Sequence, residues 1–237
     1  MLTRLALRLA TVRALRGRTL ARANVRDSEH GEIDEVLTEK PEPIVIVYTD
    51  DGQRSPKGND LFATGQDATQ RLVIEFALTM RQKVLDEDGN EDIQAVQPLT
   101  DASLEFSLDV MERQIIAALT HPSGDWPQMW NSLVSEVVSV DSQRGISQRE
   151  GVRFAGRQMT LTVRTPKEPP VGATIGPLWT RFLALVEVDA DLAPLRATIE
   201  ALLTGGDLDA DEVFRAAYGL TQDEASAMGL NTQVDAP

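Results

Sequence analysis

The sequence has no cysteine, few aromatic residues and no long apolar run. The lack of cysteine excludes disulfide bonds, thiolate zinc sites and cysteine nucleophiles. Aromatic side chains make up 5% of the 237 residues, which argues against an extended surface for stacking nucleic acid bases. No stretch of 18 apolar residues occurs, so we expect neither a membrane-spanning helix nor a membrane partner. The hydrophobic share of 42% is that of an ordinary globular chain.

Acidic residues are absent from one end of an otherwise acidic chain. The first 26 residues carry seven arginines and no aspartate or glutamate, whereas the whole chain has 23 basic and 37 acidic residues and a net charge of −14. Without those seven arginines, 16 basic and 37 acidic residues remain, so the body has a net charge near −21. Such a body repels DNA. Its contrast with the cationic end predicts contact between copies, or with an acidic partner.

The cationic end predicts a helix over residues 2–16. One side at helical spacing is aliphatic: Leu2, Leu5, Leu9 and Val12. Three arginines flank it: Arg4, Arg8 and Arg13. The opposite side is small or apolar: Thr3, Leu7, Ala10, Thr11 and Ala14. Two interpretations remain open, a plain amphipathic core helix or a helix whose opposite side meets a neighbouring copy. A mitochondrial presequence has a similar composition, but we favour a structural helix.

The elements after this helix predict an α+β fold with a small mixed or antiparallel sheet flanked by helices. Alternating and β-branched runs predict strands, spaced apolar residues predict helices, and clusters of glycine, proline and acidic residues predict turns. The expected order is strands at 24–29 and 43–49, a loop at 50–59, a strand at 69–80, a turn at 85–92, helices at 101–119 and around 126–133, and strands at 136–141 and 152–165. A polar turn is expected at Gly145 and a bulge at Gly156.

A Lys-Glu-Pro-Pro segment at 167–170 predicts a linker. We therefore expect one α+β domain over residues 1–166 and a helical C-terminal extension over residues 171–237. Helices are predicted near 176–188 and 192–203. Capping-box patterns predict two further short helices that begin near 209 and 221.

The sequence offers little catalytic chemistry. His30 and His121 have no nucleophile motif nearby, and a solvated or helix-capping role suits both. Acidic runs at 86–92 and 207–212 imitate calcium loops, but both have glutamate where such a loop needs glycine. No phosphate loop, dinucleotide fingerprint or nucleophile elbow occurs. We therefore expect no enzyme activity, no catalytic residue, no cofactor and no metal site.

Three segments resemble tail terminator, or tail completion, proteins of long-tailed bacteriophages. They are Leu-Ala-Leu-Arg-Leu-Ala-Thr-Val-Arg-Ala-Leu-Arg-Gly at 5–17, Asn-Val-Arg-Asp-Ser at 24–28 and Pro-Ile-Val-Ile-Val-Tyr-Thr-Asp-Asp at 43–51. The long strand at 69–80 and the helix at 101–119 continue the resemblance, which covers about residues 1–165. The segment after 171 departs from the compact members of that family.

The resemblance implies a structural virion protein. Members form a ring, typically a hexamer, at the head-proximal end of the tail tube, where they end tube growth and offer a surface for head–tail joining. The implied partners are other copies of the chain, the tail tube protein and a head-side connector or stopper. The genome would pass through the ring without sequence-specific binding, and the location would be the virion tail after assembly in the host cytoplasm.

Candidate contact residues follow from this interpretation. The cationic candidates lie on the first helix and in the loop at 50–59: Arg4, Arg8, Arg13, Arg54 and Lys57. Trp126 and Trp130, four residues apart, are either a core anchor or a contact hot spot. Two alternatives to a terminator stay open. One is another connector component, such as an adaptor or stopper, or a minor tail protein, and the other is an unrelated hydrolase or binding module.

Overall fold

The structure is a computed structural model that describes residues 1–28, 42–64, 68–78, 80–85, 91–96, 101–121, 123–149, 152–172 and 174–206. Contacts divide the chain into two compact units. The first consists mainly of Thr3–Lys57 and Thr64–Lys167, and the second of Gly58–Ala63 and the described residues from Glu168 onward. The fold class is α+β, as predicted. The two units are described separately below.

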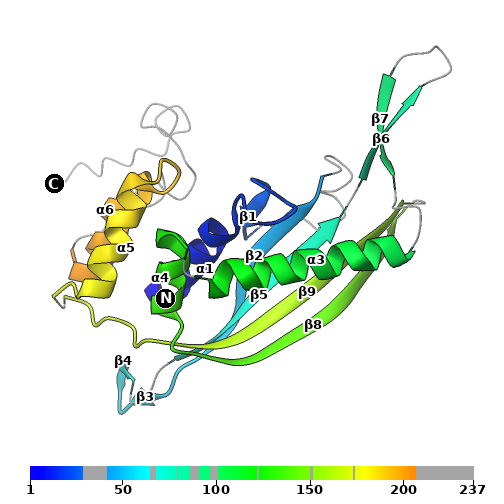
Figure 1. Ribbon diagram of the computed structural model, residues 1–237. Helices are drawn as coiled ribbons and strands as arrows, with labels where there is room; N and C mark the ends of the chain where they lie inside the picture. The colour runs from blue at the N-terminus through cyan, green and yellow to red at the C-terminus, as the bar shows by residue number, and fades with distance from the viewer. Residues whose placement is uncertain are drawn as a thin grey trace, which may run out of the picture. The chain divides into compact units, whose positions relative to one another are not determined.

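The first unit contains three helices and most of the strands among the described residues (Figure 1). Its helices are α1 (Leu2–Leu15), α3 (Asp101–Thr120) and α4 (Asp125–Leu133). The strands are β1 (Val25–Asp27), β2 (Ile44–Gln53), β3 (Pro56–Lys57), β4 (Asp60–Thr64), β5 (Ala68–Leu78), β6 (Met80–Leu85), β7 (Glu91–Val96), β8 (Glu136–Arg149) and β9 (Val152–Thr165). All of β4 except Thr64 belongs to the second unit. Two pairs, β3–β4 and β6–β7, form small sheets of their own.

The main sheet has five strands in the order β1-β2-β5-β9-β8. The β1 strand runs parallel to β2, and the other neighbours are antiparallel. The long β8 is therefore one edge of this sheet and the short β1 is the other. Helix α3 lies across the strands β5 and β9 (Figure 1).

The core lies between α3 and one face of this sheet. Side chains alternate along a strand, so Leu72, Ile74 and Phe76 point to the same face, and all three are fully buried. Their partners on β9 include Met159 and Leu161, which are buried too. On the helix, Leu108, Met111, Ile115 and Leu119 repeat at helical spacing and are buried as well. The sequence predicted both elements of this core, the strand at 69–80 and the helix at 101–119.

Helix α1 is buried more completely than its sequence suggested. The small side that includes Leu7, Ala10 and Ala14 has no exposed area, and Leu9 and Val12 on the other side are also buried. The interpretation in which the small side meets a neighbouring copy is therefore wrong. Both sides of the helix are covered by the chain itself, which explains why neither side is polar.

Several loop predictions are also wrong, because paired strands extend beyond the apolar runs. The β2 strand continues to Gln53, and β3 occupies two further residues of the expected loop at 50–59. The expected turn at 85–92 is not among them: β6 and β7 pair as far as Leu85 and Glu91, and residues 86–90 lie outside the described part of the chain. Gly145 is no turn, since it pairs with Gly156 in the β8–β9 ladder. Gly156 pairs without a register shift, and a Cβ there would lie 3.2 Å from the carbonyl oxygen of Phe76.

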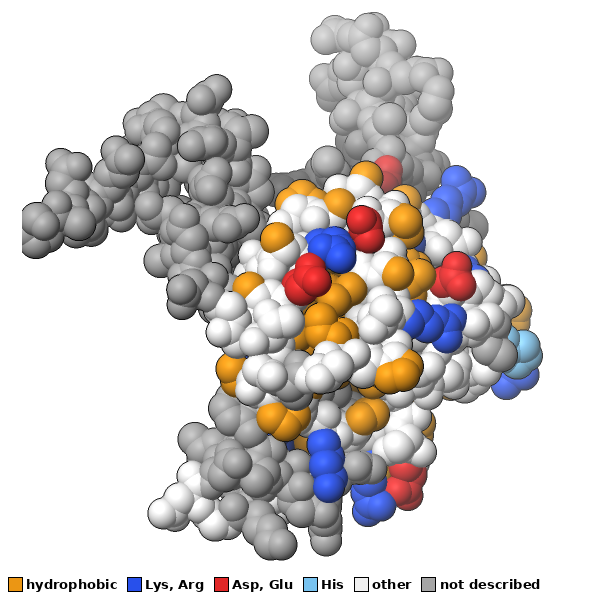
Figure 2. All heavy atoms as spheres, turned by 90° about the vertical axis from the view of Figure 1, so that its left-hand side faces the viewer, with side chains coloured by type: hydrophobic (Ala, Val, Ile, Leu, Met, Phe, Trp, Pro, Cys, Tyr) orange, Lys and Arg blue, Asp and Glu red, His pale blue; other side chains and the backbone are white. Residues whose placement is uncertain are grey.

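The second unit is helical in its described C-terminal part. It contains α5 (Pro177–Val188), the short 3-10 helix η1 (Ala193–Leu195) and α6 (Arg196–Thr204). Trp179 and Phe182 meet edge to face with ring centroids 5.8 Å apart, and Ile199 and Leu203 of α6 are buried. The helices predicted from 209 and 221 lie outside the described residues. Figure 2 shows hydrophobic side chains exposed among separate charged ones.

Candidate interaction surface

The clearest candidate surface is the turn that follows α1, residues 16–22, which we name the arginine turn. Its backbone is closed by two hydrogen bonds, from Gly17 N to Arg22 O at 2.7 Å and from Arg22 N to Thr19 O at 2.9 Å. Gly17 has a φ of 73°, a left-handed conformation that glycine adopts at little cost. The sequence therefore ends the helix and closes a compact turn within six residues.

Burial alternates along the arginine turn. Thr19 and Ala21 point inward and are buried, whereas Leu20 is 39% exposed. Arg16, Arg18 and Arg22 are all exposed. The backbone N–H of Leu20 donates to Oε1 of Gln114 on α3 at 2.8 Å, which fixes the turn to the neighbouring helix. The turn thus carries three exposed arginines and one partly exposed leucine.

Arg18 is held by the segment between α3 and α4. Its Nη1 donates to Ser123 Oγ at 3.1 Å, and its Nη2 donates to the carbonyl oxygen of Ser123. Gly124 has a φ of 102°, and a Cβ there would lie 3.0 Å from Arg18 Nη2. Both partners of Arg18 are neutral, so these bonds orient the positive charge without neutralising it.

Arg22 adopts an uncommon backbone conformation. Its φ is 53°, in the left-handed region, which costs a residue with a Cβ on the order of 1 kcal/mol. Glycine or asparagine would fit the same turn more easily. An arginine at a strained, exposed position makes its side chain a candidate for contact with a partner.

The arginines predicted from sequence lie elsewhere on α1. Arg4 is exposed, and Arg13 is partly buried. Arg8 is only 22% exposed, and its Nε lies 2.5 Å from Oδ1 of Asp27 on β1. This pair ties α1 to the edge of the main sheet, so Arg8 has a structural role within its own chain.

The other predicted contact residues are dispersed. Arg54 is exposed directly after β2, and Lys57 lies in β3. On α4, Trp126 is half-buried and Trp130 is 3% exposed. The indole of Trp130 is thus part of the core of this unit. These residues come from different parts of the first unit, namely the end of β2, β3 and α4.

The arginine turn could have been found from the sequence by a closer argument. Arg4, Arg8 and Arg13 precede the helix-ending Gly17, where a helix must bury part of its circumference. Arg18 and Arg22 follow that glycine, where a turn exposes side chains. The informative feature was the position of each arginine relative to the end of the helix. A count of arginines does not contain this information.

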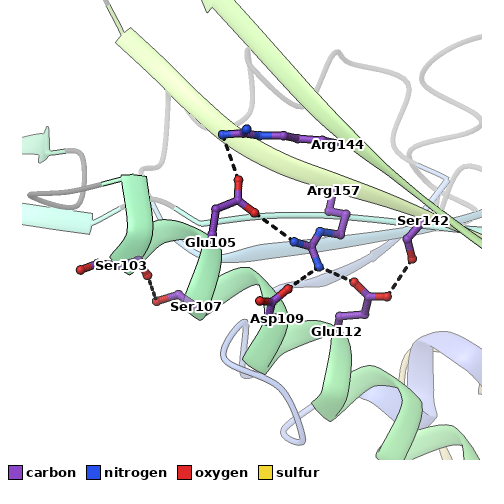
Figure 3. A network of polar contacts seen from close by, with 8 residues as sticks. All are labelled: Ser103, Glu105, Ser107, Asp109, Glu112, Ser142, Arg144 and Arg157. Atoms are coloured by element: carbon purple, nitrogen blue, oxygen red, sulfur yellow. Dashed lines mark hydrogen bonds and ion pairs between the residues drawn. The ribbon is translucent and has the colours of Figure 1, made fainter.

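A second polar cluster joins α3 to the main sheet (Figure 3). The guanidinium of Arg157 on β9 contacts three carboxylates that lie on one side of α3: Glu105 at 3.1 Å, Asp109 at 2.7 Å and Glu112 at 2.6 Å. Burial lowers the pKa of Arg157, but hydrogen bonds with Glu112 and Asp109 outweigh it and raise the pKa above the ordinary arginine value. The cluster is a charged clamp between helix and sheet.

A third cluster crosses three strands on the other face of the sheet. Tyr48 Oη donates to Glu75 Oε1 at 2.7 Å, and Gln158 Nε2 donates to the same oxygen at 2.6 Å. Burial, then the hydrogen bond and charge of Glu75, raise the pKa of Tyr48 well above its usual value. The phenol is therefore a neutral donor that holds the carboxylate in place.

Metal and membrane features were also sought among the described residues. No group of three histidine, aspartate or glutamate side chains in that part of the chain could hold a metal ion. None of the described helices combines the length and apolar character that a membrane span needs. His121 is exposed beyond the end of α3. His30, the acidic run at 86–90 and the run from 207 lie outside the described residues.

Comparison with known proteins does not provide a family. No family model matches the chain, and no curated protein matches it in sequence.

Proposed function

We propose that this chain is a structural subunit that forms a ring at the head-proximal end of a bacteriophage tail tube. In this role it ends tube growth and offers a surface for the head-side connector. The proposal extends the resemblance of residues 5–17, 24–28 and 43–51 to tail terminator proteins. These segments correspond to α1, β1 and β2, which form one connected part of the first unit.

The arginine turn is the observation that carries this proposal. A closed ring of identical subunits needs two different complementary patches on each copy. A fixed, exposed cationic turn on a chain with a net charge of −14 supplies one such patch. Opposite charges on a second patch would favour the correct register of neighbouring copies more than they would add affinity.

The test is electron microscopy of particles from a phage lysate in which the gene is deleted. We expect tail tubes longer than normal, without heads, because nothing would end polymerisation of the tube. Expression of the full chain in the same host should restore tails of normal length.

Other outcomes would point to other functions. Tails of normal length together with heads that leak DNA would assign the chain to the head-side connector. Particles without any defect would remove the structural role altogether. A deletion of an unrelated, non-structural phage gene is the matched control for changes that come from lysate preparation.

A further inference from the structure

An acidic counterpart to the arginine turn lies at the end of α5. Residues 187–191 have the sequence Glu-Val-Asp-Ala-Asp, and we name them the acidic knob. Val188 is 81% exposed, the largest exposure among the large hydrophobic residues described. Glu187 is 63% exposed on its side chain, and Asp191 is exposed too. The knob therefore combines acidic side chains with one exposed apolar side chain.

The acidic knob has a fixed backbone. Asp189 N donates to Val186 O at 3.3 Å, and Ala193 N donates to Asp189 O at 2.8 Å. The Asp189 side chain accepts a hydrogen bond from Asp191 N at 3.1 Å. The carbonyl groups at the end of α5 add partial negative charge at the same place. Little conformational freedom would be lost when such a surface binds a partner.

The acidic knob itself contains three acidic residues and no basic one. Arg196 lies 3.5 Å from Glu187, but its closer contact is with Glu200, at 2.6 Å. One arginine is thus shared between two carboxylates.

We propose that the arginine turn of one copy binds the acidic knob of a second copy. Arg16, Arg18 and Arg22 flank Leu20 in the sequence of the turn, and Glu187, Asp189 and Asp191 flank Val188 in that of the knob, so the two segments match in both charge and apolar character. Guanidinium–carboxylate hydrogen bonds would form around a leucine–valine contact that excludes water. The two surfaces are different, so the contact is head to tail, the kind that closes rings.

A second copy fits the arginine turn better than nucleic acid does. The net charge of −14 repels a polyanion at long range. A small acidic segment such as the knob of a second copy interacts mainly with the arginine turn and is attracted to it. Leu20 at the centre of the turn favours a partner that also has an apolar side chain. This inference rests on the proposed function in one respect: the contact between the arginine turn and the acidic knob would be the subunit contact of the proposed ring.

The test uses the absence of cysteine from the natural chain. Two full-length variants, Leu20→Cys and Val188→Cys, are mixed and oxidised, and disulfide-linked pairs of chains are counted by mass spectrometry. A tag of different mass on each variant separates mixed pairs from pairs of one variant. We expect the mixed pair to exceed pairs of one variant about tenfold, because the contact raises the effective concentration of the two thiols.

Val171→Cys is the matched control, since Val171 belongs to the same unit as Val188 and is 57% exposed. Its mixture with Leu20→Cys should give no enrichment of mixed pairs. Equal yields from the Val188 and Val171 mixtures would overturn the proposal, and circular dichroism checks that all variants fold.

Charge reversal supplies a second arm that spares Arg18 and Asp189, whose side chains make the hydrogen bonds described above. Arg16→Glu with Arg22→Glu, added to the Leu20→Cys chain, should abolish the mixed pair. Glu187→Lys with Asp191→Lys in the Val188→Cys chain should restore it. If the yield of the mixed pair is the same with and without these charge reversals, the two surfaces do not recognise each other by charge.

The outcome is separable from that of the proposed function. Overlong tubes after gene deletion, without enrichment of the mixed pair, would leave the ring function standing and remove this contact. Enrichment of the mixed pair, with normal particles after deletion, would establish the contact and remove the tail function.

Discussion

Arg157 shows how one residue can connect a helix to a sheet. It is the only side chain drawn in Figure 3 that contacts three carboxylates, and only 16% of it is exposed. Without this arginine, Glu105, Asp109 and Glu112 would repel one another along one side of α3. The clamp thus stabilises the helix and its packing on the sheet together.

We predict that Arg157→Met lowers the free energy of unfolding by about 2 kcal/mol. This decrease is smaller than the loss of a fully buried ion pair would cause, because Asp109 is 67% exposed and water screens its charge. Urea denaturation monitored by circular dichroism measures the change. Arg164→Met is the matched control, since its bridge to Glu136 is half exposed and should change stability by less than about 0.5 kcal/mol. Equal effects of both substitutions would contradict the role of the clamp.

Tyr48 gives the protein a specific dependence on alkaline pH. Its pKa is raised in the fold, so the folded state keeps a proton that the unfolded state loses above the ordinary tyrosine value of about 10. The stabilisation is therefore complete below about pH 10 and is lost progressively as the pH rises beyond it.

We predict that Tyr48→Phe removes this dependence. Between about pH 9 and pH 11 the natural chain should lose up to about 1 kcal/mol more than the variant, after a discount for solvent screening at a half-buried site. Urea denaturation of both chains at a series of pH values measures the difference. Parallel profiles would show that Tyr48 titrates equally in the folded and unfolded states.

At the scale of single elements, the end of α6 depends on one glycine. Gly205 has a φ of 71°, and its N–H bonds back to Ala201 O as a helix cap. A Cβ at this position would lie 2.9 Å from Cγ1 of Val171. Both the backbone conformation and the crowding thus favour glycine here.

We predict that Gly205→Ala destabilises the second unit by about 1–2 kcal/mol. Gly206→Ala is the control, because a Cβ at that position would meet its neighbours at an ordinary 3.6 Å. Hydrogen exchange of the α6 amides reports the change locally, so a loss of protection confined to α6 is the expected result. Equal exchange rates of the α6 amides in both variants would mean that Gly205 has no special role in the stability of α6.

The elements also show which parts of the fold the sequence could predict. Helices α1, α3 and α5 have apolar residues at helical spacing and clear end signals, so their bounds were predicted within one or two residues. The second half of β8 is polar, from Ser142 to Arg149. Its strand conformation comes from backbone pairing with β9, and periodicity of the side chains cannot reveal such a ladder.

For the whole molecule, composition predicted a cationic end on an acidic body but could not say which arginines are exposed. That distinction depends on where α1 ends and on its pairing with Asp27, and neither follows from a residue count. The knob at 187–191 was one of many acidic segments in the sequence. It stands out only when the exposure of Val188 is known.

The strand order has a consequence for how the protein is made. The central strand β5 pairs with β9, and Ala68 lies opposite Thr165, 97 residues later in the chain. During synthesis on the ribosome, β5 therefore emerges long before the strand that covers one of its edges. The sheet cannot be completed until residue 165 has left the exit tunnel. Contacts this far apart in sequence slow folding and leave an unpaired edge exposed in the meantime. Nascent chains interrupted before β9 should accordingly be strong clients of chaperones.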